Sequence, residues 1–394
     1  MRSEEFLSGM PGRLVVIDSA GHKAFEPDPL PPTIEWDAHL ARLIEQAAGA
    51  LRLLDGRARS LENPYLLIRP LLSKEAVASN RIEGTTATIG EVLRYEAGDH
   101  ETGDPDEIRE VVNYLNALQV GLMRPAERPL SWGFFNELHR LLLDSVRGEE
   151  RNPGRPRQIQ FVIGPPGRTG NDRLESARFI PPPPTALPGL LGDFETWLAN
   201  DDGNPALVRL ALMHYQFETI HPYEDGNGRL GRLLITLLMQ EWGILSQPVL
   251  YLSEYLERNK PEYIDRMRAV SLEGAWRPWI EFFIQAVEHQ ARDAYNIVSS
   301  LLMIHSEWQK KYKTGKPPAY LLHVLDQLFV RTFLSPVGLA NEIGVQPVQI
   351  QRAINRLVED GILHEVTGKQ RNRIYVSPVL LALINGHKSK IDQE

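Results

Sequence analysis

The sequence predicts a mainly α-helical fold organised around a short polar loop between two buried helices. Residues 205–220 carry apolar side chains at close to helical spacing, and residues 230–238 repeat the pattern until Gly243, which is placed as a helix C-terminal cap. Strand-like alternation is short and local, as in the runs 158–163 and 177–180. We therefore expect packed helices with small β-hairpins.

The loop, residues 221–232, reads HPYEDGNGRLGR and concentrates groups that phosphate chemistry can use. His221 titrates near neutrality and can accept a proton from a hydroxyl. Asp225 is a hard oxygen ligand suited to Mg²⁺, because this ion takes one or two carboxylates together with the phosphates of a substrate. These residue types indicate a phosphoryl-transfer or nucleotidyl-transfer site.

The second half of the loop supplies groups that bind anions. Gly226 and Gly228 flank Asn227, so that the backbone can approach a phosphate without Cβ atoms in the way. The helix that begins here offers unpaired N–H groups and the positive end of its dipole. Arg229 and Arg232 are three residues apart and project from one face of the first turn. A solvated loop, whose arginines only cap the helix or pair with the neighbouring carboxylates, is the alternative.

These twelve residues resemble the signature of the Fic (filamentation induced by cAMP) family, HPFx(D/E)GNGRxxR, with Tyr223 in place of Phe as the departure. The resemblance implies a helical fold and the transfer of AMP from ATP to a protein hydroxyl. It implies that His221 is the general base and Asp225 the Mg²⁺ ligand. The ATP phosphate-binding residues would be the anion hole and two cations: Gly226, Asn227, Gly228, Arg229 and Arg232. Tyr223 would be an apolar anchor in the core, provided that its hydroxyl finds a partner.

A second stretch, SNRIEG at 79–84, ends a helix expected over 64–82. In Fic proteins the pattern (S/T)xxxE(G/N) marks an inhibitory helix, whose Glu reaches the second Arg of the signature and occupies the place that the ATP γ-phosphate needs. The resemblance therefore implies that Glu83 pairs with Arg232 and that Ser79 holds the helix near the anion loop. A surface carboxylate beside a glycine cap is the alternative for Glu83.

The runs 158–163 and 177–180 are joined by a Gly/Pro-rich turn and resemble the Fic flap, a β-hairpin that holds the target polypeptide by strand addition. A hairpin that serves only as a lid is the alternative. The turn lacks the Lys-Ser/Thr pair of a P-loop. After the signature, Asn259 and Tyr263 are candidates for the adenine pocket, with ordinary helix-surface or core roles as the alternative.

Three domains are expected from the length and from breaks in the pattern. Residues 1–105 would form an N-terminal arm, irregular to about residue 33, and a helical cap with a long helix over Trp36–Gly56 and the inhibitory helix. Residues 106–313 would form the catalytic domain, and residues 319–394 a separate C-terminal domain. Further helices are expected at 85–95, 106–123, 131–146, 248–290 and 285–312.

The C-terminal segment, residues 319–394, reads as three helices and a β-hairpin and resembles a winged helix-turn-helix domain. Polar residues on its third helix and wing could contact DNA: Gln346, Gln349, Gln351, Arg352, Arg356, Lys369, Arg371 and Arg373. The segment holds 8 Lys/Arg and 7 Asp/Glu, so it is hardly basic. Dimerisation or protein docking is the alternative role.

The composition excludes several classes of function. With 51 acidic and 43 basic residues the net charge is −8, which argues against a general nucleic-acid-binding chain. The absence of cysteine excludes disulfides, thiolate nucleophiles and Cys-ligated zinc. Neither a signal peptide nor a membrane span is recognisable, so we expect a cytoplasmic protein without a membrane partner.

The leading hypothesis is a Mg²⁺-dependent protein adenylyltransferase, self-inhibited by Glu83, that transfers AMP from ATP to a Ser, Thr or Tyr hydroxyl of a target held by the flap. The target could include the chain itself, and Glu83 could act within a homodimer. Removal of AMP, with Glu83 orienting a water, and transfer from another nucleotide or phosphate-containing donor are alternatives of the same class. A nucleotide-sensing, DNA-binding transcriptional regulator is the alternative of another class, but sensing alone would not require the base His221.

Overall fold

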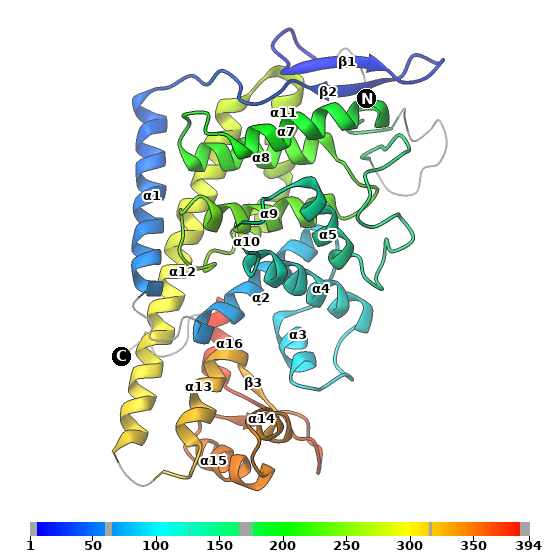
Figure 1. The fold of residues 1–394 in the computed structure, drawn as a ribbon. Coiled ribbons are helices and arrows are strands. Elements are labelled where there is room, and N and C mark those ends of the chain that lie inside the picture. Colours follow the sequence, from blue (N-terminus) through cyan, green and yellow to red (C-terminus); the bar gives the residue numbers. More distant parts are fainter. Residues whose placement is uncertain are drawn as a thin grey trace. The chain divides into compact units, whose positions relative to one another are not determined.

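The computed structural model describes residues 6–59, 65–125, 127–164, 174, 176–314 and 317–386. Helices dominate the described chain, as predicted (Figure 1). The chain divides into two compact units, each assembled from segments that are far apart in the sequence. The first unit comprises Met1–Gly49, Asn116–Ile244 and Tyr255–His289, and the second comprises Ala50–Leu115, Leu245–Glu254 and Gln290–Glu394. The expected three-domain division stays a prediction.

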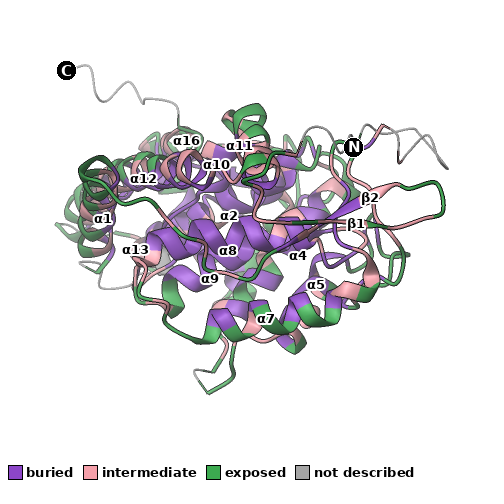
Figure 2. Ribbon diagram, turned by 90° about the horizontal axis from the view of Figure 1, so that it is seen from above, coloured by how far each residue is buried: buried purple, intermediate pink, exposed green. Residues whose placement is uncertain are grey.

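The first unit is built on a central pair of helices. α8 (Ala206–Ile220) and α9 (Asn227–Glu241) pack against each other, α7 (Leu187–Ala199) packs on α8, and α5 (Trp132–Leu142) packs on α9. Figure 2 shows α8 and α9 mostly in the colour of buried residues. The other elements of this unit are β1 (Gly12–Val16), β2 (Lys23–Pro27), the 3₁₀ helix η2 (Pro184–Ala186) and α11 (Lys260–Glu273). α1 (Ala38–Arg59), α4 (Pro105–Leu122), α10 (Ser253–Arg258) and α12 (Trp276–Lys313) have residues in both units.

Gly231 allows the central helices to approach closely. A Cβ atom at this position of α9 would lie 2.4 Å from Oε1 of Glu218 and 3.1 Å from the ring of Phe217, both on α8. These distances are shorter than ordinary van der Waals contacts, so a side chain at residue 231 would require the Glu218 and Phe217 side chains to shift. The glycine therefore helps to place the two helices that carry the signature loop.

The N-terminal arm differs from the irregular segment that we expected. β1 and β2 pair as an antiparallel hairpin, and its turn is closed by Oδ1 of Asp18, which accepts the backbone N–H groups of Ala20 and His22, each at 3.0 Å. The Phe25 side chain is fully buried, and its N–H donates to the carbonyl of Ile180 at 2.9 Å. Burial of this ring ties the hairpin to the rest of the first unit.

Two helix boundaries also differ from expectation. α1 begins at Ala38, because Asp37 accepts the N–H of Leu40 at 2.8 Å in the manner of a helix N-cap, and it continues through Gly56 to Arg59. A glycine inside a helix costs only about 1 kcal/mol, which packing and the Asp55–Arg59 ion pair can outweigh. α12 begins nine residues before the expected position, at Trp276.

The expected flap forms less β-structure than predicted. Residues 158–163 and 177–180 meet only through an isolated bridge between Ile163 and Phe179. The physical reason lies in the prolines that follow, since residues 181–184 have no N–H groups to extend a ladder. Side chains bond the nearby carbonyls instead. Most of the turn between the two runs lies outside the described residues.

The second unit contains α2 (Tyr65–Ile82), which packs against α13 (Leu321–Arg331), α3 (Ile89–Glu96) and α16 (Pro378–Ile384). The C-terminal segment runs α13, β3 (Phe333–Leu334), α14 (Pro336–Ile343), α15 (Pro347–Glu359), β4 (His364–Glu365), β5 (Tyr375–Val376) and α16. Its strands form a three-stranded sheet in the order β3-β5-β4. The first helix ends at Arg331 rather than at Phe333, because Phe333 pairs with Val376 in the sheet.

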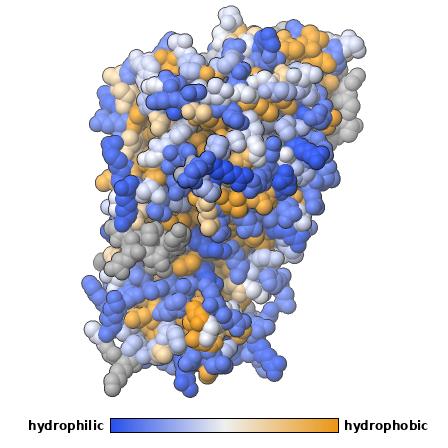
Figure 3. Space-filling view, in the orientation of Figure 1, coloured by the Kyte–Doolittle hydropathy of each residue, from blue (hydrophilic) through white to orange (hydrophobic). Residues whose placement is uncertain are grey.

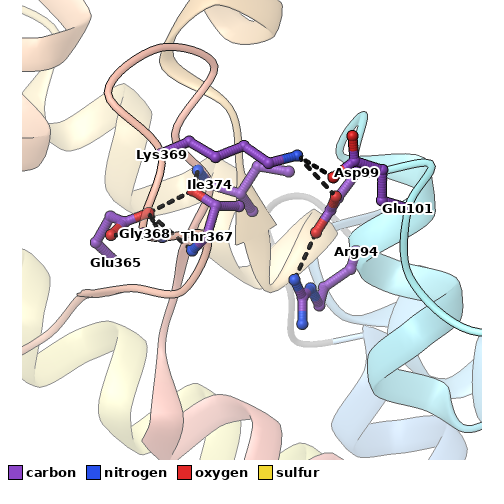
Figure 4. Close-up of polar contacts among 8 residues, drawn as sticks. All are labelled: Arg94, Asp99, Glu101, Glu365, Thr367, Gly368, Lys369 and Ile374. Atoms are coloured by element: carbon purple, nitrogen blue, oxygen red, sulfur yellow. Dashed lines mark hydrogen bonds and ion pairs between the residues drawn. The ribbon is translucent and has the colours of Figure 1, made fainter.

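The β4–β5 loop is tied to another part of the second unit. Nζ of Lys369 lies 2.8 Å from Glu101 and 3.6 Å from Asp99, and Arg94 also binds Asp99 (Figure 4). In the same loop, Glu365 accepts the N–H groups of Thr367 and Gly368. The ion pairs of Lys369 hold the loop against the segment between α3 and α4.

Hydrophilic side chains cover most of the face drawn in Figure 3, with smaller hydrophobic areas between them. No helix in the described part of the chain has the length and apolar character needed to cross a membrane.

Candidate active site

The polar loop joins α8 to α9, as the sequence predicted. α8 ends at Ile220, and His221 adopts the left-handed conformation with φ 50° and ψ 63°. Gly226 is also left-handed, with φ 75°, and α9 begins at Asn227. Positive φ is uncommon for residues other than glycine, so the His221 backbone must be held by its surroundings.

Asn227 closes the loop with its side chain. Oδ1 accepts the backbone N–H of Tyr223 at 2.9 Å, and Nδ2 donates to the carbonyl of the same residue at 2.8 Å. The Tyr223 ring is fully buried, and its hydroxyl donates to Oδ1 of Asn136 at 2.8 Å. The hydroxyl therefore has the partner that a buried Tyr requires, and burial raises its pKa far above the usual value.

His139 of α5 supports the loop, although no motif in the sequence marks it. Its ring stacks on Tyr223 with centroids 3.8 Å apart. Nδ1 accepts the N–H of Gly154 at 2.8 Å, so Nε2 carries the proton and donates to the carbonyl of Asp225 at 2.7 Å. Burial lowers the pKa of His139 to about 4, which keeps the ring neutral near pH 7.

Asp225 is the carboxylate of this loop that we expect to bind a cation. Its side chain is 25% exposed. Oδ1 accepts the N–H of Gly226 at 2.7 Å and lies 3.4 Å from Arg229, while Oδ2 lies 3.6 Å from Arg151. Among the described residues, no group of three or more His, Asp or Glu side chains could hold a metal ion. One partly exposed carboxylate fits Mg²⁺ that takes its remaining ligands from phosphates and water.

Both arginines of the signature are buried. Arg229 is 1% exposed and Arg232 is 2% exposed, so they do not belong to a solvated surface loop. Arginine keeps its charge when buried. Burial lowers the pKa of His214 to about 3, and the charge of Arg232 contributes to the same shift. The first turn of α9 therefore places two guanidinium groups in the interior, at the end of the helix where the dipole is positive.

The imidazole of His221 is oriented by its own helix. Nδ1 lies 3.2 Å from the carbonyl of Glu218, and since a carbonyl can only accept, Nδ1 carries the proton. Nε2 is then the basic nitrogen of the ring. Phe161 stacks on the imidazole with centroids 5.3 Å apart. This tautomer suits a group that takes a proton through Nε2.

Two family profiles match the chain. The Fic/DOC family N-terminal profile matches residues 41–123, and the Fic/DOC family profile matches residues 129–239, which include the whole signature. The chain belongs to the Fic family.

Curated relatives carry names that state an activity. A protein of Aquifex aeolicus, named a probable protein adenylyltransferase, is 36% identical over 99 residues, which are 25% of this chain and 28% of the relative. Protein adenylyltransferase fic-1 of Caenorhabditis briggsae is 29% identical over 209 residues, which are 51% of this chain and 37% of the relative. The chain thus spans well under half the length of these relatives.

Solved structures share the fold. A crystal structure of a Fic family protein from Desulfovibrio desulfuricans G20 superposes with a TM-score of 0.58 at 22% identity, covering 88% of this chain and 98% of the other. At this identity the likeness supports the fold alone.

The residues expected to inhibit the Fic site lie at the end of α2. Ser79 is fully buried within the helix, whereas Glu83 directly follows the last helical residue and is exposed. Gly84 then adopts φ 102°, which ends the helix. Glu83 belongs to the second unit and Arg232 to the first, and the pairing between them stays a prediction.

The two adenine-pocket candidates occupy ordinary structural positions. Asn259 is the N-cap residue of α11, and its Nδ2 donates to the carbonyl of Tyr255 at 2.9 Å. Tyr263 is buried, with its hydroxyl 2.7 Å from Nε2 of His214 and its ring against Trp279. These are the helix-end and core roles that the sequence left open, and the adenine pocket stays a prediction.

Proposed function

We propose that this Fic protein is a Mg²⁺-dependent protein adenylyltransferase that moves AMP from ATP to a Ser, Thr or Tyr hydroxyl of a target protein. The observation that carries the proposal is the loop itself. Within twelve residues it brings together an oriented imidazole, a partly exposed carboxylate and two buried guanidinium groups at a helix N-terminus. The names of the curated relatives support the same activity.

The base of the proposed reaction is His221. Nε2 takes the proton of the target hydroxyl, and the hydroxyl oxygen attacks the α-phosphorus of ATP in line. The bond from the α-phosphorus to the bridging oxygen breaks, and pyrophosphate leaves. The Nδ1 contact with Glu218 keeps the ring in the tautomer that this step needs.

The phosphates would be bound at the start of α9. Asn227 and Gly228 contribute backbone N–H groups of the first turn, while Arg229 and Arg232 contribute charge. Asp225 would hold Mg²⁺, which neutralises phosphate charge when it is bound. His139 holds the Asp225 backbone in place by donating to its carbonyl.

We further propose that Glu83 inhibits this activity by pairing with Arg232 in competition with the γ-phosphate. The test uses ATP labelled on the α-phosphate, with the wild type, Glu83→Gly and Glu83→Gly/His221→Ala, in a lysate with Mg²⁺. Protein label should rise in the single variant and vanish in the double variant. Absence of label in all three, with ATP binding intact, would overturn the proposal. Release of AMP from a modified target by the wild type would indicate the reverse reaction.

We infer that the segment from α13 to α16 is a winged helix-turn-helix domain that docks on protein. The order of its helices and its three-stranded sheet support this assignment. The wing residue Lys369, a candidate DNA contact, is already paired with Asp99 and Glu101 of the same unit, which favours docking over DNA binding (Figure 4). A salt-sensitive mobility shift on the DNA upstream of its own gene would contradict this role.

A further inference from the structure

Arg157 is a buried arginine that the reaction proposed above does not use. The residue is 1% exposed. Its guanidinium donates hydrogen bonds to four backbone carbonyls. Nε donates to His221 at 2.8 Å, and Nη2 donates to Pro182 at 2.6 Å and to Ile220 at 3.4 Å. Nη1 donates to Ile159 at 3.2 Å.

The location of these carbonyls explains why the charge is tolerated. Those of Ile220 and His221 lie at the C-terminal end of α8, where the helix dipole is negative and the last carbonyls lack intrahelical partners. Burial lowers the pKa of Arg157 to about 10, so the group remains charged near pH 7. Only a planar guanidinium offers five N–H donors in a fixed plane, which four carbonyls from three separate segments require.

The same residue holds the backbone on the C-terminal side of the proposed base. Its side chain binds the carbonyl of His221, and its backbone N–H donates to the carbonyl of Pro222 at 2.8 Å. The orientation of these two peptide planes depends on the dihedral angles at residues 221 and 222. Arg157 therefore helps to hold His221 in the left-handed conformation, in which the ring reaches the carbonyl of Glu218.

Arg157 also connects the base to the segment that we expect to hold the target. We call residues 158–163 and 177–182 the two stems. The guanidinium binds Ile159 on one stem and Pro182 on the other, and Gln160 donates to the carbonyl of Pro181 at 2.8 Å. Phe161 of the first stem stacks on the His221 ring. A single side chain thus links both stems and the end of α8.

We propose that Arg157 is a positioning residue, which fixes the backbone of His221 and keeps the two stems at a set distance from the imidazole. This inference rests on the proposed function for its effect on catalysis, although the structural link stands without it. A target hydroxyl held on the stems would then meet Nε2 at one fixed geometry. An error of about 1 Å in such geometry can reduce a rate about 100-fold.

The kinetic test compares two lysine substitutions in the Glu83→Gly background. Arg157→Lys keeps the charge but cannot bind four carbonyls at once, so kcat should fall about 100-fold while KM for ATP stays within about twofold. The matched control is Arg209→Lys. Arg209 is likewise a buried arginine of the first unit, and it donates to the carbonyls of Trp197 and Asn200 at the end of α7. Its substitution should leave kcat within about twofold.

Two ¹⁵N NMR measurements test the structural role of Arg157 without relying on catalytic activity. In the unsubstituted protein, Nε–H of Arg157 should be protected from solvent exchange, and the His221 ring should be protonated at Nδ1. In Arg157→Lys the His221 ring should lose its single tautomer, while Arg209→Lys should retain it. Rapid exchange of Arg157, or unchanged His221 signals in Arg157→Lys, would overturn the inference.

The two proposals can fail separately. If Glu83→Gly itself attaches no label to protein, the proposed function fails, and the NMR signals alone decide the role of Arg157. If Glu83→Gly is active and Arg157→Lys loses no more kcat than Arg209→Lys, the positioning role is wrong and the proposed function stands.

Discussion

His139 gives a prediction that follows from its buried, neutral ring. Its pKa of about 4 lies below the ordinary value of 6.5, since burial disfavours the imidazolium. The unfolded chain therefore binds the proton more readily than the folded one. The stabilisation is complete above pH 6.5 and is lost as the pH falls towards 4, and linkage puts the loss at about 2 kcal/mol between pH 7 and pH 5.

The substitution His139→Gln isolates this contribution. Gln can accept from Gly154 and donate to Asp225 as His139 does, but it does not titrate. At pH 7 the variant should be less stable by about 1 kcal/mol, because the stacking on Tyr223 is lost. At pH 5 it should equal or exceed the wild type.

Urea denaturation at pH 7, 6 and 5 measures this change. The difference in unfolding free energy between wild type and variant should shrink steadily as the pH falls. A difference that stays constant over this pH range would refute the burial argument.

Three further substitutions test the packing and the surface contacts. Gly231→Ala should lower the melting temperature, with a cost of about 1 kcal/mol, because the new Cβ would lie 3.1 Å from the Phe217 ring and would displace the Glu218 carboxylate. Gly189→Ala, with open space around it, should be neutral or slightly stabilising. Tyr223→Phe should cost about 0.5–1.5 kcal/mol in urea denaturation, because the half-buried acceptor Asn136 loses its donor, yet label transfer should persist. Lys369→Ala should change the unfolding free energy little, and any loss should vanish at high salt; a loss that persists at high salt would mean that the wing contact is more than a surface ion pair.

The helix–loop–helix around His221 was predictable because its signals are local. Helical periodicity marks α8 and α9, and Gly226 provides the left-handed residue from which α9 starts. His139 and Arg157 were missed for the opposite reason. Their partners are backbone carbonyls 86 and 64 residues away, and a backbone carbonyl leaves no trace in the sequence.

One β-hairpin was not predicted, and another was predicted with more β-structure than it has. The N-terminal hairpin was missed, because its stability depends on the burial of Phe25 against a distant segment. The flap strands were overpredicted, since alternation was present but the following prolines and the side chain of Gln160 replaced the ladder. Strand pairing depends on tertiary partners more than helix formation does.

Position-specific labelling of ATP tests directly whether this chain transfers AMP. Glu83→Gly would be incubated with a lysate and Mg²⁺ in two parallel reactions, one with ATP labelled on the α-phosphate and one with ATP labelled on the γ-phosphate. We predict label on protein only from the α-phosphate, with loss of that label in Glu83→Gly/His221→Ala. Label from the γ-phosphate would contradict AMP transfer. Label from the α-phosphate that survives the loss of His221 would contradict the role of this residue as the base.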